Sequence, residues 1–218
     1  MNRIKIDELP LKEKAYRLIK DKLIKCELMP GMDISEEQLS KEIGSSRTPV
    51  REALLRLEQE KLVNIYPRKG IIVSYITIKD IYEVFQIREM IEIQSAKIVC
   101  KSIAREKLME FQARFDKLGI EGNLISEKEF YDLDIEFHKY IVDSTNNNRL
   151  IEFMNKIYDQ DYRIRVMTTR SDEQERKRNR PEHLGIINAL LEKNEDTLEK
   201  KIRKHIENAR SAALKIVY

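Results

Sequence analysis

The chain of 218 residues contains little glycine, proline and cysteine, and it has no long apolar run. With six glycines, five prolines, 41% hydrophobic and 36% charged residues, the composition favours a soluble protein rich in helices. No apolar run approaches the ~20 residues of a membrane helix, and the amino terminus lacks the apolar core of a signal peptide. We therefore expect a cytoplasmic protein with no membrane partner.

The two cysteines, Cys26 and Cys100, are far apart and lack the spacing of metal ligands. This favours reduced thiols, as in cytosolic proteins. The net charge is only +3, but residues 1–75 contain 15 Lys and Arg against 12 Asp and Glu, so the positive excess lies in the amino-terminal third. That excess is too small to indicate nucleic-acid binding by itself.

Residues 45–57 are predicted to form a helix with two functional faces. One face is apolar because its residues recur at i, i+3, i+4 and i+7, namely Val50, Ala53, Leu54 and Leu57. Arg47 and Arg51 lie one turn apart on another face, beside Thr48, and Ser46 is placed to cap the helix. Such a helix can enter the major groove of DNA, where Arg binds guanine bidentately. The alternative is an ordinary amphipathic surface helix.

The segments around this helix favour DNA recognition. A helix is expected from Leu11 to Lys25, a capping pattern at 35–38 opens a short helix, and Gly44 ends it just before the two-faced helix. Two β-rich runs, 62–66 and 71–75, then flank a turn with Arg68 and Lys69 at its tip. We interpret this as a two-stranded wing that contacts phosphates or the minor groove, although basic turns are often merely solvated.

From Ile78 onward the pattern is helical throughout. The expected helices span 79–103, 105–118, 126–145, 147–168, 173–193 and 196–216. Six helices of this length can form an antiparallel bundle with one core. The predicted fold is therefore mostly α, with a winged helix-turn-helix domain at 1–75 and an all-helical bundle at 76–218.

All three histidines of the chain and one aspartate are predicted to face the core of this bundle. Asp134 and His138 are spaced i, i+4 in the middle of an apolar arc, and His183 and His205 lie among apolar residues of two other helices. A buried carboxylate is costly unless it is compensated, and one divalent ion would compensate it. Asp with three His suits a transition metal; zinc is expected, and nickel, manganese and iron are alternatives. For each His alone, a hydrogen-bonded core residue is the ordinary interpretation.

Arg88 also falls on an inward, apolar face. An arginine in such a position needs an anion, and a small carboxylate effector could supply one through a bidentate contact. The alternative is an ion pair with Glu92, one turn further along the same helix.

The amino-terminal motifs resemble those of the GntR family of bacterial transcription regulators. The resemblance covers about residues 9–75 and rests on Gly31, the segments 35–39, 46–54, 57–58 and 62–63, and the Arg68-Lys69-Gly70 tip. It implies that Arg47 and Arg51 contact bases, Thr48 contacts a phosphate and Gly70 contacts the minor groove. The resulting candidate DNA-binding residues are Ser46, Arg47, Thr48, Arg51, Arg68, Lys69 and Gly70.

The carboxy-terminal segment resembles the FCD effector domain of the FadR-type subfamily. The matching segments are 88–92, 134–138 and 182–183, together with His205 after the break at 194–196. With six expected helices, this segment resembles the shorter, VanR-like group of FCD domains. This resemblance implies that Asp134, His138, His183 and His205 bind the metal, and that a small carboxylate binds beside it or directly to it.

We therefore expect a bacterial transcription regulator that binds a palindromic double-stranded operator as a homodimer. Repression is its expected mode of action. It would lie in the cytoplasm, at the nucleoid when bound to DNA, and a carboxylate effector would modulate its operator binding. The alternative is a metal-dependent hydrolase with an appended DNA-binding domain. A third possibility is a regulator whose histidines only form hydrogen bonds.

Overall fold

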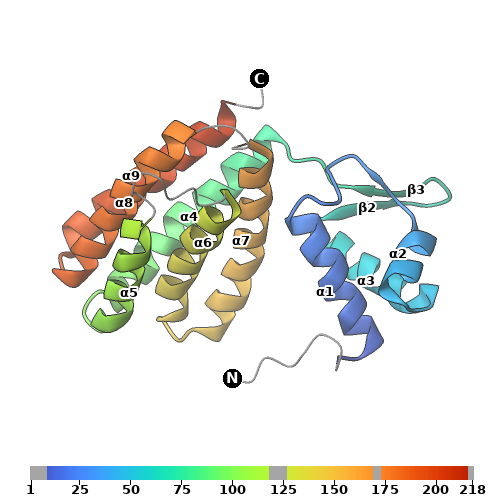
Figure 1. Ribbon diagram of the computed structural model, residues 1–218, viewed down its shortest axis with the longest axis horizontal. Coiled ribbons are helices and arrows are strands. Elements are labelled where there is room, and N and C mark those ends of the chain that lie inside the picture. Colours follow the sequence, from blue (N-terminus) through green and yellow to red (C-terminus); the bar gives the residue numbers. More distant parts are fainter. Residues whose placement is uncertain (1–8, 118–126, 169–172, 216–218) are drawn as a thin grey trace. The chain divides into compact units, whose positions relative to one another are not determined.

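A computed structural model of the chain describes residues 9–117, 127–168 and 173–215 (Figure 1). The chain divides into two compact units, Met1–Ile76 and Thr77–Tyr218. Among the described residues, every helix is too short or too polar to cross a lipid bilayer.

The first unit contains three helices and a small sheet. Its elements are α1 (Leu11–Ile24), β1 (Asp33–Ile34), α2 (Glu36–Ile43), α3 (Arg47–Gln59), β2 (Val63–Tyr66) and β3 (Gly70–Val73). The Ser35 hydroxyl begins α2 by accepting a hydrogen bond from the Gln38 backbone N–H at 3.3 Å. Gly44 ends α2 with φ of 70°, a left-handed conformation that favours glycine, and α3 starts three residues later.

The sheet of this unit has three strands rather than the two that the sequence predicts. Their order is β1-β3-β2, and both pairings are antiparallel. The hairpin of β2 and β3 is the expected wing, whereas β1 adds two residues, Asp33 and Ile34, to the free edge of β3. A strand of two residues is too short to display an alternating pattern, so the sequence gives no sign of it.

The core of the first unit lies between α1, α3 and the sheet. The predicted apolar face of α3 is confirmed, because Val50, Ala53, Leu54 and Leu57 are all buried. They pack with Ile19 and Leu23 of α1 and with Val63 and Val73 of the wing. This packing fixes the apolar face of α3 inward and leaves its other face exposed to solvent.

The second unit is a bundle of six helices among the described residues. They are α4 (Ile78–Val99), α5 (Arg105–Lys117), α6 (Glu127–Asp143), α7 (Asn148–Thr168), α8 (Glu173–Leu191) and α9 (Glu195–Leu214), close to the predicted spans. Thr77 and Asp80 form a capping box that begins α4, and the Asn194 side chain caps α9. Within the bundle α4 contacts α6, α7 and α9, and α9 contacts α4, α7 and α8 (Figure 1).

Candidate functional site

The two arginines of α3 lie in the first turns of the helix and point away from the core. Arg51 is exposed, and no ion pair of its guanidinium occurs within the described part of the chain. Arg47 is also exposed but is paired with Glu37 of α2, with Nη2 and Oε2 2.8 Å apart. Ser46 occupies the N-cap position of α3, but its side chain makes no capping hydrogen bond, contrary to the prediction. Ser46 and Thr48 are both exposed.

The tip of the wing presents its two cations on a tight turn. The Lys69 backbone N–H donates to the Tyr66 carbonyl at 3.0 Å, which closes the turn. Arg68 has φ of 62°, and Gly70 has φ of 118°, a conformation that side-chain-bearing residues rarely adopt. All three tip residues, Arg68, Lys69 and Gly70, are exposed. The turn therefore offers two cations and an unobstructed backbone to a ligand.

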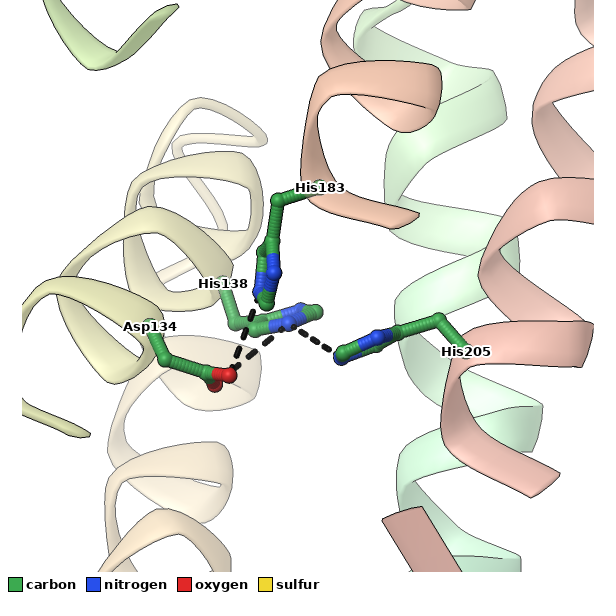
Figure 2. Close-up of side chains that lie close together, drawn as sticks. All are labelled: Asp134, His138, His183 and His205. Carbon is green, nitrogen blue, oxygen red and sulfur yellow. Dashed lines mark hydrogen bonds and ion pairs between the residues drawn. The ribbon is translucent and has the colours of Figure 1, made fainter. Parts of the chain in front are cut away.

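The four predicted metal ligands converge inside the bundle (Figure 2). Asp134 and His138 come from α6, His183 comes from α8 and His205 comes from α9. One ligand atom from each residue lies within 4.8 Å of all the others. The four side chains are at most 2% exposed, so the cluster is closed off from solvent.

Each histidine is oriented by a hydrogen bond at Nδ1. His138 Nδ1 lies 2.7 Å from Glu92, His205 Nδ1 lies 2.9 Å from Glu182, and His183 Nδ1 lies 2.8 Å from the Asn179 carbonyl. These partners are acceptors, so each Nδ1 carries the hydrogen and each Nε2 is directed to the centre of the cluster. This is how metal-binding histidines are usually held.

The distances between the central atoms fit a shared cation. His138 Nε2 and His205 Nε2 are 3.2 Å apart, and Asp134 Oδ1, the carboxylate oxygen without a hydrogen bond, is 3.7 Å from His138 Nε2. Zinc–nitrogen bonds of roughly 2.0–2.1 Å in a tetrahedron require nitrogen atoms about 3.3 Å apart. Burial, with His183 and His138 nearby, holds the pKa of His205 well below its ordinary value, so its Nε2 offers a lone pair.

The alternative, histidines that only form hydrogen bonds, explains less of this geometry. A proton shared between His138 and His205 would satisfy those two rings. It would leave Asp134 Oδ1 buried without a hydrogen bond, and His183 Nε2 with only an ion-pair contact to Asp134 Oδ2 at 3.2 Å. Because buried polar atoms are rarely left without a partner, the donor set fits a metal ion better.

Asp134 is held in its ionised form by its surroundings. Burial raises the pKa of its carboxyl, but Arg165 and His183 outweigh this and hold the pKa well below its ordinary value. Arg165 Nη1 donates a hydrogen bond to Asp134 Oδ2 at 2.9 Å. The other carboxylate oxygen, Oδ1, accepts no hydrogen bond. The carboxylate is therefore oriented and available as a ligand through Oδ1.

Arg88 belongs to a chain of buried ion pairs that begins beside the cluster. Its Nε donates a hydrogen bond to Glu92 Oε1 at 2.7 Å. The ion pair with Glu92, which the sequence suggested as the alternative to a bound carboxylate, is therefore present. Its Nη1 donates to Asp161 at 3.0 Å, and Asp161 also accepts from Arg165 at 2.9 Å. These ion pairs connect α4 with α7, and Arg165 connects them with Asp134 of the cluster. Arg88 therefore lies next to the cluster with two carboxylate partners of its own.

Sequence reasoning missed four of the residues around the cluster: Asp161, Arg165, Glu182 and Asn179. The first two had a signal, because an acid and a base at i, i+4 share an inward face of α7 with Tyr158. Glu182 precedes His183 and contacts a different histidine across to α9, which no local spacing reveals. Glu92 was considered only as a partner of Arg88, yet it also orients His138.

Comparisons with known proteins agree with both units. Residues 11–73 match the bacterial regulatory proteins of the gntR family, and residues 83–208 match the FCD domain. The HTH-type transcriptional repressor RspR of Escherichia coli K12 is 24% identical over 91% of this chain and 86% of its own length. Among solved structures, E. coli McbR/YncC has a TM-score of 0.82 at 18% identity, covering 96% of this chain and 100% of that chain.

A solved FCD domain is similar to the second unit alone. The zinc-bound FCD domain of TM0439 has a TM-score of 0.55 at 21% identity, and the similarity covers 66% of this chain and 99% of that chain. At this identity the similarity concerns the fold only.

Proposed function

The chain belongs to the bacterial regulatory proteins of the gntR family and contains an FCD domain, and from this premise we propose how its two parts act in a DNA-binding transcription regulator. Residues 1–75 bind the operator, and residues 76–218 bind a divalent metal and a small carboxylate and hold two copies together. The two copies read a palindromic operator, because a twofold dimer matches a site with twofold symmetry. The regulator acts as a repressor, as the name of the relative RspR supports, and we place it in the cytoplasm.

DNA binding is assigned to the exposed face of α3 and the tip of the wing. Arg47 and Arg51 of α3 reach base edges in the major groove, while Ser46 and Thr48 contact phosphates. Arg68 and Lys69 contact the backbone or the minor groove, and Gly70 permits the close approach. The exposure of all these side chains, beside a buried opposite face of α3, supports the assignment.

Metal binding is assigned to Asp134, His138, His183 and His205. The observation that carries this proposal is the convergence of one ligand atom from each of these four buried residues, in a cluster where Asp134 Oδ1 has no hydrogen bond. Zinc suits this set of three imidazoles and one carboxylate, and nickel, manganese and iron are the alternatives. A metal ion bound here supplies positive charge and an attachment point for an anionic ligand.

The charges around the cluster support an anionic effector. The linked ion pairs comprise three carboxylates, Glu92, Asp134 and Asp161, and two guanidinium groups, Arg88 and Arg165. The formal sum of these buried groups is one negative charge, which a divalent cation would reverse to one positive charge, while Glu182, which is 15% exposed at its side chain and pairs with His205, lies outside this sum. A small monocarboxylate would then restore neutrality in a buried site, where uncompensated charge is costly. Arg88 assists by exchanging one of its present carboxylate partners for the ligand.

Membership of a family of regulatory proteins does not support the alternative of a metal-dependent hydrolase. The matched gntR family and the relatives are transcription regulators, and the relative RspR is a repressor. The protein is a regulator and not an enzyme.

The proposal is tested by following metal, carboxylates and DNA binding in one series. The full chain is stripped with a chelator and reloaded with zinc, and its thermal stability is scanned against small monocarboxylates and dicarboxylates. We expect zinc to raise the melting temperature, and at least one monocarboxylate to raise it further only when zinc is present. Operator affinity, measured by fluorescence anisotropy, should then change with that carboxylate. A carboxylate effect that is equal with and without zinc would contradict the proposed site.

A further inference from the structure

Arg47 is the one candidate DNA-reading cation that is held by a carboxylate in the described part of the chain. Glu37 lies in the first turn of α2, and its Oε2 is 2.8 Å from Arg47 Nη2. Its other oxygen, Oε1, is 2.9 Å from Lys41 Nζ on the same helix. By contrast, no ion pair holds Arg51, Arg68 or Lys69 among the described residues. The contact joins the two helices of the helix-turn-helix on their exposed side.

We infer that Glu37 positions Arg47 for base recognition and thereby increases discrimination between operator and other DNA. A free arginine beside DNA binds any phosphate that it can reach, because the phosphate backbone attracts cations without regard to sequence. A carboxylate that occupies Nη2 holds the side chain, while the remaining donors of Arg47 have no ion-pair partner among the described residues. Arg47 then meets a base edge already oriented, and it is less available to the backbone.

A second effect of Glu37 acts in the same direction. The first turn of a helix attracts anions through its free N–H groups, so the amino end of α2 would by itself attract a DNA phosphate. Glu36 and Glu37 place two negative charges in that turn. They weaken binding to phosphates of any sequence, so that affinity depends more on base contacts. If Glu37 served only to stabilise α2, a carboxylate in this turn would be enough. The contact between Glu37 and Arg47 would then have no role.

The inference rests on the proposed role of Arg47 as a base-reading residue. Its test compares Glu37→Gln with Glu42→Gln, which removes the same charge from the same helix. Glu42 is a close match, since its side chain is 53% exposed against 52% for Glu37, and it pairs with Lys22 rather than with Arg47. Both side chains are half exposed, so both variants are expected to fold, and circular dichroism verifies this.

The probes are two DNA duplexes bound to the full chain. One is the duplex that the wild-type protein selects from a randomised pool, and the other is a scrambled duplex of equal composition. Anisotropy titrations at several salt concentrations give the ratio of the two affinities. Glu37→Gln should bind the scrambled duplex more tightly and lower the ratio roughly three- to tenfold, in line with the ordering cost of one long side chain. Glu42→Gln should change both affinities alike and leave the ratio unchanged.

A double-mutant comparison separates positioning from direct contact. If Glu37 acts mainly through Arg47, most of the loss of the ratio caused by Glu37→Gln should disappear in an Arg47→Ala background, and only the smaller part due to phosphate repulsion at the start of α2 should remain. An equal or higher ratio for Glu37→Gln than for Glu42→Gln would overturn the inference, and so would a full effect in the Arg47→Ala background. Should Arg47→Ala itself leave the ratio unchanged, it is the proposed reading role of Arg47 that fails.

Discussion

Zinc should stabilise the wild-type chain by an amount that can be worked out in advance. A ligand that binds only the folded state at a free concentration of 100 times its Kd adds about 2.7 kcal/mol to the free energy of unfolding. For chains of 150–250 residues, each kcal/mol shifts the melting temperature by roughly 2–4 °C. The melting temperature of the chelator-treated protein should therefore rise by about 5–11 °C when zinc is added.

Replacing His183 by Ala should remove most of this rise. An outer-sphere partner of a metal ligand is worth up to roughly 100-fold in metal affinity, and a direct ligand at least as much. At the same free zinc concentration, a Kd raised about 100-fold leaves only about 0.4 kcal/mol of stabilisation, or a shift of about 1–2 °C. Differential scanning fluorimetry with and without zinc measures both shifts.

The zinc-dependent shift, rather than the melting temperature itself, is the informative quantity. His183 is fully buried and stacked on Phe115 with ring centroids 4.5 Å apart, so His183→Ala also leaves a cavity and lowers stability without metal. Phe115→Leu is the matched control, because it disturbs the same stack but removes no ligand. It should lower the melting temperature and keep the zinc-dependent shift. A His183→Ala protein that gains as much from zinc as the wild type would refute the reasoning.

Three further predictions concern DNA binding and acid stability. Arg51 is exposed on α3, so Arg51→Ala should lower operator discrimination by roughly 1–3 kcal/mol without changing the fold. Competition binding with altered operators measures this discrimination. An unchanged value would exclude Arg51 from base reading. Lys69→Ala at the wing tip should weaken binding to all duplexes and reduce the slope of log affinity against log salt by roughly one, whereas an unchanged slope argues against a phosphate contact. Burial raises the pKa of Glu92, but Arg88 and His138 lower it to about 2 from 4.5, so the unfolded chain binds more protons in that interval. Stability that is present above pH 4.5 should thus be lost as the pH falls toward 2, and acid titration of Glu92→Gln should show a shallower loss.

The helices and the buried and exposed faces of α3 follow from local patterns. The apolar positions of α3 recur with the helical period, so Val50, Ala53, Leu54 and Leu57 could be placed inward from the sequence. The same period on α6, α8 and α9 identified the four converging side chains, because a polar residue in an apolar arc has few directions to face. The pairing of β1 with β3 had no such pattern, since two residues carry no period.

The partners of the cluster depend on contacts between helices that the sequence does not encode locally. Asp161 of α7 meets Arg88 of α4 across 73 positions of the chain, and Glu182 of α8 meets His205 of α9. An inward arginine predicted only that some anion must lie nearby. Which anion it is depends on the packing of the bundle. For the same reason, the pairing of Glu37 with Arg47 became visible only when α2 and α3 were placed together.

An anomalous diffraction measurement at the zinc absorption edge, on crystals of the zinc-loaded protein, tests the central claim most directly. The account predicts one strong peak inside the bundle, bonded to Nε2 of His138, His183 and His205 and to an oxygen of Asp134. Zinc bound through an Nδ1 atom, zinc elsewhere on the protein, or a cluster without an anomalous peak would contradict it.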